Sequence, residues 1–349
     1  LSKKAKILVL DEPSAALTDS EVKKLMEILR DLKKKGVTCI YISHKLGEVF
    51  EIADRITILR DGKSIGTYDI KEITEEKVIS LMVGRELTER FPREEHTAGD
   101  VVMEVENLSV YDPEGSGSAV IDNVSFQIRK GEILGIAGLM GAGRTELVTS
   151  IFGGYPSKKT GDIYINGEKV EINSPGDAIK NGMGLVSEDR KRYGLILEQT
   201  VTTNTTLASI NQVCDWGGII NSNKEYLNSS QYVKELRIKT PTLHTKVNNL
   251  SGGNQQKVVL AKWLMTKPKI LFLDEPTRGI DVGAKYEIYN IMNELVRQGV
   301  AIVMVSSELP EILGMSDRIL VMCEGSIKAE FDYRDATQEK IMYYATGGQ

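Results

Sequence analysis

The sequence is short of the residues that usually mark disulfide scaffolds, metal proteins and membrane spans. Its 349 residues include only three cysteines, Cys39, Cys214 and Cys323. An odd number at these spacings excludes a disulfide framework or a cysteine metal site and favours a reduced, cytosolic setting. No apolar run approaches the roughly 20 residues that cross a bilayer, so any membrane role is expected to be peripheral.

An excess of positive charge is also lacking. The formal net charge is −5, so the chain has no electrostatic footprint for nucleic acid, and we predict no nucleic-acid partner. The basic runs 33–35 and 190–192 are predicted to be solvated faces. Only three histidines are present. Two of them, His96 and His244, stand in no chemical context and are predicted to be surface residues.

One stretch, Ile270–Asp281, places two carboxylates directly after an apolar run. The run is typical of a buried parallel strand, and ligands bind at the C-terminal ends of such strands. Asp274 is predicted to hold Mg²⁺ and Glu275 to orient or deprotonate a water. The alternative is a strand that ends in a helix cap, with both acids serving only the helix dipole.

The same pattern occurs twice. Ile7–Ser14 repeats the carboxylate stretch, and Asp11 and Asp274 are 263 residues apart. The correspondence runs without a gap to Gly84 and Gly347, which indicates two copies of one domain. We predict a first domain at 1–90, a linker at 91–99 and a second domain at 100–349. Because the first copy opens directly on its carboxylate strand, the sequence predicts the C-terminal fragment of a longer chain.

In the first copy, Asp11 and Glu12 correspond to the two carboxylates of the second. His44 directly follows a second predicted strand, 38–43, from where it could reach a terminal phosphate. The alternative is a packed or capping histidine. A helix over Glu75–Met82 is predicted to begin with Thr74 as its N-cap.

The second copy combines three kinds of local pattern. Alternating residues over 101–108 and 120–128 predict antiparallel strands, and Asn166-Gly167 predicts a hairpin turn. The segment 184–188 is typical of another core strand. The region from about 189 to 249 lacks core-strand signals and is predicted to be an inserted helical subdomain.

A glycine-rich turn lies between a predicted strand and a helix in Gly131–Glu146. Gly138, Gly141 and Gly143 would let backbone N–H groups surround phosphate oxygens, and Thr145 would hold Mg²⁺. The spacing is that of a phosphate-binding loop in which an arginine, Arg144, replaces lysine. A glycine turn with a purely structural role is the alternative.

A second helix start, Leu250–Gln256, also offers bare backbone amides. Ser251 is a candidate N-cap, and Gly252 and Gly253 leave the N-terminal N–H groups free to meet an anion. A plainly capped helix is the alternative for this segment taken alone.

Taken in order, these motifs resemble those of ATP-binding-cassette ATPases, with Leu250–Gln256 similar to the family's signature. The resemblance covers the whole chain and is strongest to the tandem-cassette ATPases of bacterial monosaccharide importers. The stretch 84–92 is most similar to the galactose and methyl-galactoside importers, with ribose, xylose and arabinose relatives close. It implies an α/β P-loop NTPase fold: a RecA-like core with an antiparallel β subdomain and an inserted helical subdomain, preceded by the C-terminal part of a first cassette.

The resemblance also implies ATP and Mg²⁺ as cofactors and assigns roles to individual residues. Glu275, Glu12 and His44 would be catalytic. Thr145, Asp274, Glu188 and Asp11 would serve the metal. Nucleotide contacts are expected from Tyr111, Gly138, Gly141, Ala142, Gly143, Arg144, Thr145, Glu146, Glu188, Ser251, Gly252, Gly253 and Gln255. Glu188 stands where the family usually has glutamine, and Ser307 matches His44 at the 263-residue offset.

The implied function is ATP hydrolysis that drives sugar uptake through membrane permease subunits, with a periplasmic sugar-binding protein as an indirect partner. The protein is expected at the cytoplasmic face of the membrane. Because Arg144, Glu188 and Ser307 depart from the family pattern, we predict that the second cassette hydrolyses ATP weakly and that this chain alone has low activity. The alternatives are a soluble tandem-cassette ATPase acting on ribosomes or in DNA repair, and a non-hydrolysing nucleotide-binding scaffold.

Overall fold

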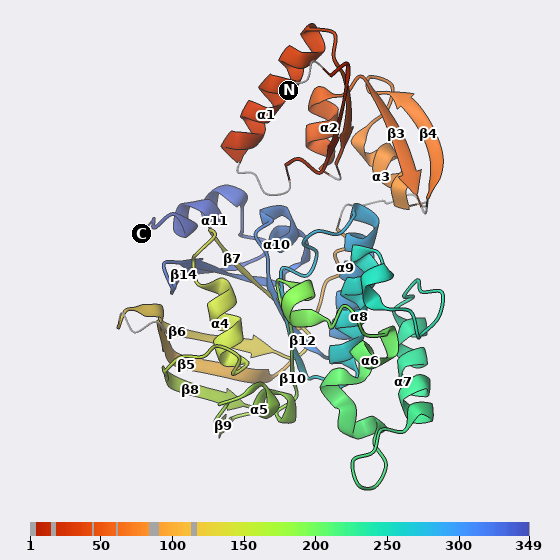
Figure 1. Ribbon diagram of the computed structural model, residues 1–349. Helices are drawn as coiled ribbons and strands as arrows, with labels where there is room; N and C mark the ends of the chain where they lie inside the picture. The colour runs from red at the N-terminus through yellow and green to blue at the C-terminus, as the bar shows by residue number, and fades with distance from the viewer. Residues whose placement is uncertain are drawn as a thin grey trace. The chain divides into compact units, whose positions relative to one another are not determined.

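A computed structural model describes residues 5–14, 19–43, 45–60, 62–83, 91–112 and 117–348. His44 and most of the stretch 84–92 that carries the closest sugar-importer resemblance lie outside these residues. The chain divides into two compact units, Leu1–Arg90 with Asp281–Gly283, and Phe91–Ile280 with Ala284–Gln349 (Figure 1). We call them unit 1 and unit 2 and describe each by itself.

The core of unit 2 is a six-stranded sheet in the order β10-β11-β12-β7-β13-β14. Its strands are β10 (Met183–Val186), β11 (Ile270–Asp274), β12 (Ala301–Val305), β7 (Ile133–Gly138), β13 (Arg318–Cys323) and β14 (Ser326–Asp332). The first five are parallel, and β14 is antiparallel to β13. Every residue of β11 and β12 is buried, which explains why these strands have continuous apolar sequences rather than alternating ones.

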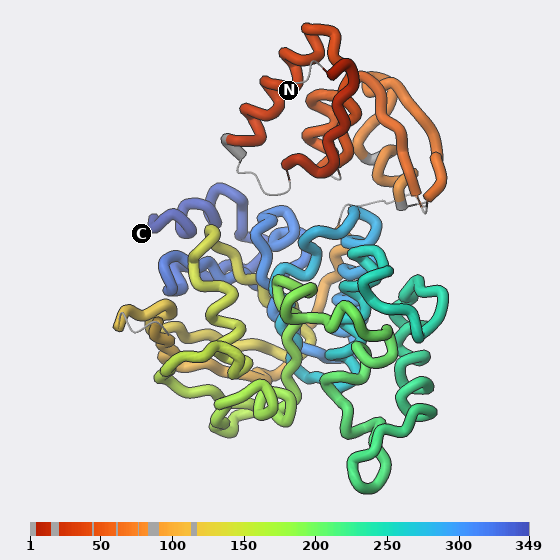
Figure 2. The backbone as a smooth tube through the Cα atoms, viewed as in Figure 1, coloured from red at the N-terminus to blue at the C-terminus, as the bar shows by residue number. Residues whose placement is uncertain are grey.

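Helices cover both faces of this sheet, as the trace in Figure 2 shows for unit 2. They are α4 (Arg144–Ile151), α5 (Pro175–Lys180), α8 (Gly252–Leu264), α9 (Val282–Arg297), α10 (Leu309–Met315) and α11 (Gln338–Ala345). The apolar spacing of α9 shows why such segments are helical, because Ile288, Met292 and Leu295 recur at three- and four-residue intervals and are buried on one face.

A second, antiparallel sheet has the strand order β6-β5-β8-β9. Its strands are β5 (Val101–Tyr111), β6 (Ala119–Arg129), β8 (Lys159–Ile165) and β9 (Glu168–Val170). Asn166 and Gly167 have φ values of 51° and 81°, as a two-residue hairpin turn requires. The antiparallel region predicted from alternating residues is therefore confirmed.

Between β10 and α8 the chain forms a helical segment that contains α6 (Val201–Thr206) and α7 (Ser222–Glu235). Short helical turns lie at Arg190–Gly194, Leu207–Val213 and Val247–Asn249. Asn204 is fully buried and binds the backbone of Ile196 and Thr200 through its side chain. The inserted helical subdomain predicted here is present in the fold.

Unit 1 repeats the second half of unit 2 element by element. It consists of β1 (Ile7–Asp11), α1 (Asp19–Lys34), β2 (Thr38–Ile42), α2 (Leu46–Ile52), β3 (Arg55–Arg60), β4 (Lys63–Asp69) and α3 (Glu75–Val83). Ile7 pairs with Thr38 in the register in which Ile270 pairs with Ala301. The irregularity after Ile58 in β3 recurs after Val321 in β13, so the 263-residue offset holds in three dimensions. The helix α3 begins after Thr74, whose hydroxyl accepts from the Lys77 N–H at 3.3 Å, as predicted.

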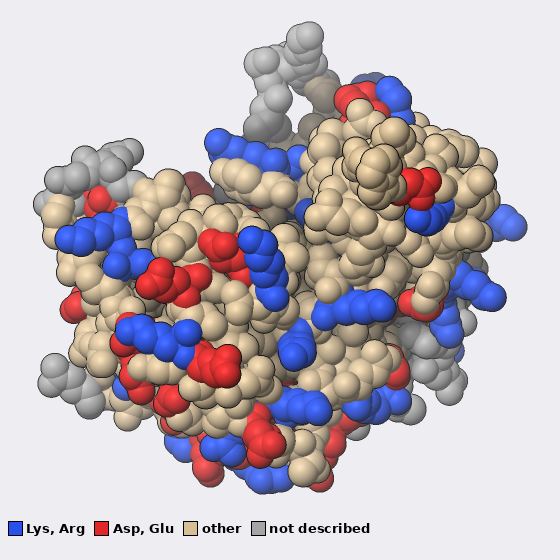
Figure 3. Space-filling view, turned by 90° about the horizontal axis from the view of Figure 1, so that it is seen from below, with Lys and Arg blue, Asp and Glu red and all other residues tan. Residues whose placement is uncertain are grey.

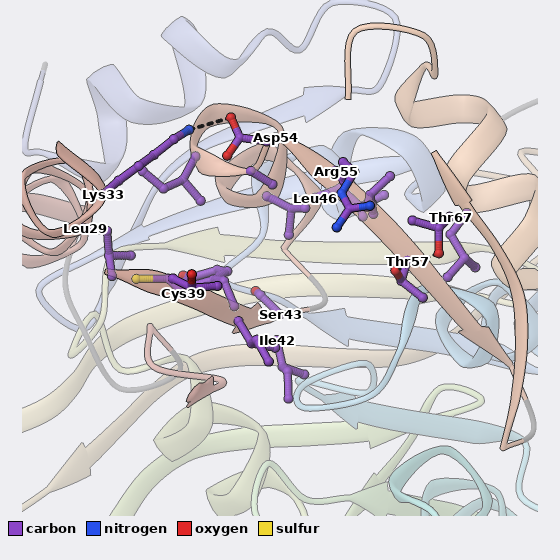
Figure 4. A pocket seen from close by; sticks show the side chains of 18 of the residues that line it. Leu29, Lys33, Cys39, Ile42, Ser43, Leu46, Asp54, Arg55, Thr57 and Thr67 are labelled. Atoms are coloured by element: carbon purple, nitrogen blue, oxygen red, sulfur yellow. Dashed lines mark hydrogen bonds and ion pairs between the residues drawn. The ribbon is translucent and has the colours of Figure 1, made fainter. Parts of the chain in front are cut away.

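The two units differ in how completely their strands are covered. In unit 1, β2 and β3 belong to separate two-stranded sheets, and a cavity of about 850 Å³ lies between them. Figure 4 shows its lining, with the Lys33–Asp54 ion pair of 2.6 Å at one side. The matching strands of unit 2, β12 and β13, both pair with β7. Ile7 and Val9 are 63% and 60% exposed, whereas their counterparts in β11 are buried.

The segment 91–99, at the start of unit 2, packs against the rest of that unit. The Phe91 ring lies 5.5 Å from that of Tyr289, and Arg93 donates to the carbonyls of Leu313 and Ser316. The prediction that His96 is a surface residue is wrong. Its side chain is only 5% exposed, and its Nδ1 lies 3.0 Å from a carboxylate oxygen of Asp317.

Candidate functional site

The glycine loop of unit 2 joins β7 to α4 in a conformation that needs glycine. Gly143 precedes α4 with φ 93°, in the left-handed region. A Cβ on Gly143 would lie 2.8 Å from Ile121 Cδ1, and one on Gly138 would lie 2.6 Å from the Met322 carbonyl oxygen. The loop is therefore held tightly at both ends, with the N-terminal amides of an eight-residue helix available to an anion.

Asp274, at the end of β11, fits the role of a metal ligand. The residue is 1% exposed, the Thr145 hydroxyl lies close enough to its carboxylate to lower its pKa, and its Oδ1 has no hydrogen-bond partner among the described residues. Burial raises the pKa of Asp274 to about 6, while Thr145 and Arg144 oppose the rise. A buried carboxylate oxygen without a partner beside a hydroxyl suits Mg²⁺, which binds through few protein oxygens together with phosphate and water.

Glu275 follows in a strained backbone conformation, with φ 49°. Its N–H donates to the Val305 carbonyl at 2.9 Å, which fixes it beside the end of β12. Its Oε1 lies 3.7 Å from Arg144 Nη2, and its Oε2 accepts from the Ser307 hydroxyl at 3.2 Å. Burial raises the pKa of Glu275 to about 7 although Arg144 and Ser307 lower it, so this carboxylate is poised to exchange a proton near neutral pH.

Arg144 links the glycine loop to the ends of β11 and β12. It is 9% exposed, and its Nη1 donates to the Ser306 carbonyl at 2.6 Å while its Nη2 faces Glu275. The structure thus brings together Arg144, Glu275 and Ser307, three positions that are far apart in the sequence. Both terminal nitrogens of the Arg144 guanidinium therefore contact groups of the protein.

Glu188 pairs with Arg278, a residue that the sequence did not single out. Arg190 is partly buried, and its Nη1 and Nη2 donate to the carbonyls of Arg278 and Gly279 at 2.8 and 3.2 Å. The prediction that 190–192 is a solvated basic face is therefore wrong for Arg190. Its guanidinium turns inward because two backbone carbonyls of the loop after β11 offer acceptors.

The signature segment is shaped mainly by packing. Ser251 occupies the N-cap position of α8 but makes no side-chain cap; its hydroxyl accepts from the Asn254 amide at 2.9 Å. A Cβ on Gly253 would lie 2.5 Å from Ala284 Cβ, and one on Gly252 would lie 2.9 Å from Arg190 Nη2. Gln255 is buried and donates to the Val247 carbonyl at 3.0 Å, so its side chain holds the start of the helix.

The remaining nucleotide candidates lie around the same loop. Tyr111 ends β5 opposite Ala119, one residue from Val120, whose carbonyl oxygen would lie 3.2 Å from a Cβ on Gly143. Ala142 is 6% exposed, and the Glu146 carboxylate is close enough to Asp274 to raise its pKa. Gly141 has open space where a Cβ would stand.

Unit 1 places its carboxylates in the same way. Asp11 ends β1, and Glu12 has φ 45° and donates its N–H to the Ile42 carbonyl at 2.9 Å, as Glu275 does to Val305. His44 cannot be compared, because it lies outside the described residues.

Sequence reasoning missed a buried carboxylate on α10. Glu311 is 1% exposed and accepts from the hydroxyls of Thr277, at 2.8 Å, and Ser306. Burial raises the pKa of Glu311 although both hydroxyls lower it. The signal that could have found it is the repeat, because Glu48 stands 263 residues earlier and binds the hydroxyl of Ser14.

Comparison with known sequences gives a consistent result. Residues 121–278 match the family described as ABC transporter. The chain is 65% identical to the xylose import ATP-binding protein of Thermoanaerobacter pseudethanolicus over 349 residues, which are 100% of this chain and 69% of the relative. It is 50% identical to the ribose import and 49% identical to the galactose/methyl galactoside import ATP-binding proteins of Clostridium tetani, over 99% of this chain in each case and 67% and 68% of the relatives.

Solved structures show the same fold. A nucleotide-free ATP-binding cassette from an ABC transporter aligns with a TM-score of 0.57 at 23% identity, over 71% of this chain and 96% of its own. A dimeric cassette in a post-hydrolysis state bound to ADP and Pi aligns with a TM-score of 0.57 at 22% identity, over 67% and 100%. The P-loop NTPase fold is thereby confirmed, and the sequence relatives add the family: the chain belongs to the ATP-binding-cassette family, among the ATP-binding subunits of sugar importers, which couple ATP hydrolysis to sugar uptake.

Proposed function

We propose that unit 2 holds MgATP at the loop Gly138–Thr145 and hydrolyses it slowly. The observation that carries the proposal is that the Arg144 guanidinium contacts the Ser306 carbonyl and the Glu275 carboxylate. A lysine ammonium is a compact charge on a flexible stem, whereas the arginine fork is planar and is committed to two partners here. Ser307 offers only a neutral hydroxyl to Glu275.

The roles of the chain's own residues follow from this geometry. Thr145 and Asp274 would hold Mg²⁺, which when bound neutralises phosphate charge and orients the terminal phosphate. The amides after Gly143 would bind phosphate oxygens, and Glu275 would accept a proton from the attacking water. Its raised pKa favours this acceptance, but its ion pair with Arg144 opposes the same step.

We also propose that the two units are parts of two cassettes that work as a pair. The support is the element-by-element repeat, down to the positive φ of Glu12 and Glu275. In the family, each ATP lies between the phosphate loop of one cassette and the signature of the other. On this proposal Glu12 and His44 serve the hydrolysing site, and Glu275 serves the slow one.

Binding of MgATP tests the first proposal directly. A fluorescent ATP analogue should bind the unmodified chain, and Gly143→Asp should lose most of that affinity because a side chain cannot fit beside Ile121 and adds negative charge. Gly117→Asp, on an open loop position of unit 2, is the control. Equal affinity in all three proteins would refute the site.

For the transported sugar, we propose xylose. The xylose import protein named above is 65% identical to this chain, compared with 49% for the galactose/methyl galactoside protein. Xylose uptake and galactose uptake should be measured in cells in which this chain replaces the matching part of the importer's own ATP-binding subunit. Restored galactose uptake without xylose uptake would overturn the assignment.

The helical segment between β10 and α8 is the proposed contact with a membrane permease, at the cytoplasmic face. Within the described part of the chain, none of the helices has the length and hydropathy needed to cross a membrane. The segment exposes Trp216 at 99%, Ile219 at 72% and Leu227 at 67%. Cysteines introduced there should cross-link to a co-expressed permease, and cysteines introduced in the β5–β6 sheet should not. Cross-links from the sheet alone would contradict the proposal. A periplasmic sugar-binding protein would act through that permease.

The ribosomal and DNA-repair alternatives have no specific observation in their favour. On the face shown in Figure 3, basic and acidic side chains are interspersed rather than gathered by sign. A nucleic-acid partner would call for a basic stripe.

A further inference from the structure

Glu311 joins two loops that belong to different parts of the sequence. Thr277, two residues after Glu275, donates to Glu311 Oε1 at 2.8 Å. Ser306, immediately before Ser307, donates to Glu311 Oε2. Each carboxylate oxygen therefore holds one loop, and the residue is 1% exposed, so water cannot replace either contact readily.

The turn at 306–307 also contacts both Arg144 and Glu275. Ser306 offers its carbonyl to Arg144 at 2.6 Å, and Ser307 donates to Glu275 at 3.2 Å. A shift of the turn at 306–307 would move both of these contacts at once. Glu311 makes neither of these contacts itself, because its own oxygens accept from Thr277 and Ser306.

Unit 1 has a related arrangement, in which both hydroxyl donors bind Oε2 of Glu48 and the second donor lies in β2 rather than in the turn after it. The Ser14 hydroxyl, at the position of Thr277, donates to Glu48 at 2.7 Å. The second donor there is the Tyr41 hydroxyl, at 2.6 Å. A buried or half-buried glutamate with two hydroxyl donors thus recurs although the second donor comes from a different position, which argues against chance packing.

We propose that Glu311 is a positioning residue that holds the turn 306–307 against the Glu275 loop, and thereby sets how well unit 2 distinguishes ATP from ADP. The inference rests on the proposed placement of phosphates at Gly138–Thr145. The turn lies beside Arg144 and Glu275, where the terminal phosphate of ATP would be. ADP lacks that phosphate, so its affinity should not depend on the turn.

The test compares the dissociation constants of MgATP and MgADP for the complete chain and its variants. Glu311→Ala removes both acceptors, Glu311→Gln keeps one acceptor oxygen, and Thr277→Val removes a single donor. Glu132→Ala is the matched control, because Glu132 is also 1% exposed and binds Arg318 and the Arg129 N–H. It lies before β7, at the end of that strand opposite the glycine loop.

Glu311→Ala should weaken MgATP binding about five- to tenfold and leave MgADP binding within about twofold. The dissociation constant of Glu311→Gln for MgATP should lie between those of Glu311→Ala and the unmodified chain. Glu132→Ala should lower the melting temperature without changing the ratio of the two constants. If Glu311→Ala does not fold, Thr277→Val should still shift the ratio in the same direction. If Glu311→Ala weakens the binding of both nucleotides equally, or if the control shifts the ratio of the two constants by the same amount, this inference is wrong but the phosphate site still stands. An unmodified chain that binds neither nucleotide would overturn the phosphate site and the inference with it.

Discussion

Arg144 Nη2 and Glu275 Oε1 lie 3.7 Å apart, so the basic residue of the glycine loop is paired with the carboxylate that would activate water. Both side chains are about 10% exposed, and solvent screens the pair weakly. A phosphate that reaches Arg144 would share the guanidinium charge with Glu275. Nucleotide affinity and the ion pair are therefore in competition.

Glu275→Gln should consequently tighten MgATP binding. The substitution removes the charge that holds Arg144 and one negative charge near the terminal phosphate. We expect a gain of about three- to tenfold in affinity, corresponding to an interaction on the order of 1 kcal/mol. Ser307→Ala, which removes only a neutral hydrogen bond to the same carboxylate, should have a smaller effect. Weaker MgATP binding by Glu275→Gln, measured by titration calorimetry, would contradict the competition.

Restoring the family's residues should raise ATP turnover. Arg144→Lys supplies a compact charge, and Ser307→His supplies an imidazole next to Glu275. Since loss of one transition-state donor costs on the order of 10²–10³ in rate, the double variant should release phosphate at least about tenfold faster than the unmodified chain. Adding Glu275→Gln should abolish the gain. Unchanged phosphate release by the double variant would show that these residues do not limit unit 2.

A buried lysine gives a pH-dependent prediction that does not involve the nucleotide. Lys262 is 5% exposed, donates to the Gly194 carbonyl at 2.7 Å, and burial lowers its pKa to about 8. A folded-state pKa below the unfolded value means that folding releases a proton between about pH 8 and 10.5, so this residue's contribution to stability rises with pH across that window.

The measurement is the free energy of unfolding of the unmodified chain and of Lys262→Met at several pH values. Relative to the variant, the unmodified chain should gain about 1–3 kcal/mol between pH 8 and 10. Other lysines and tyrosines titrate in both proteins, so only the difference is diagnostic. Parallel curves would show that Lys262 is not desolvated in solution.

Local stability should differ between the units. The strands β1 and β2 expose Ile7, Val9, Ile40 and Ile42 at 46–63%, and a cavity of about 850 Å³ separates β2 from β3. Because few buried contacts protect these strands, their amides should exchange much faster than those of β11 and β12, which are buried throughout. Hydrogen exchange by mass spectrometry compares corresponding strands within one chain. Equal protection of β1 and β2 and of β11 and β12 would refute the expectation.

The sequence predicted the elements that depend on local pattern. The strands β1 and β11 follow from apolar runs, the turn at Asn166-Gly167 from its required positive φ values, and the repeat from residue identity at a constant offset. Gly138 and Gly143 were identified for phosphate contact, and the structure adds a second reason, since a Cβ at either would collide with a neighbouring strand or loop.

The contacts that decide the chemistry could not be predicted in this way. Arg144 and Glu275 meet only because β7 and β11 flank β12 in the sheet. Arg190 was hidden in a basic run, and His96 in a segment of polar composition, because composition does not report which side chain finds a buried acceptor. No residue near Glu311 in the sequence indicates its role. Only the repeat does, through its counterpart Glu48.

The asymmetry of the two units leads to the last prediction, made for the importer assembled in cells. Glu12 and Glu275 share the same backbone conformation and the same bond to the neighbouring strand, so their local geometry does not distinguish them. Their chemical neighbours do. Glu275 has Arg144 and Ser307 beside it, whereas Glu12 belongs to the copy in which His44 occupies the position of Ser307.

If hydrolysis depends on the copy with the histidine, Glu12→Gln should abolish sugar uptake and phosphate release, because it removes the proton acceptor of that site. Glu275→Gln should leave a substantial part of both, because its site already lacks the lysine and the histidine. The matched pair of substitutions is isosteric and changes one charge in each case, so differences in folding should be small. Equal loss of activity in the two variants would mean that unit 2 is itself catalytic and that the Arg144–Glu275 ion pair does not restrain it.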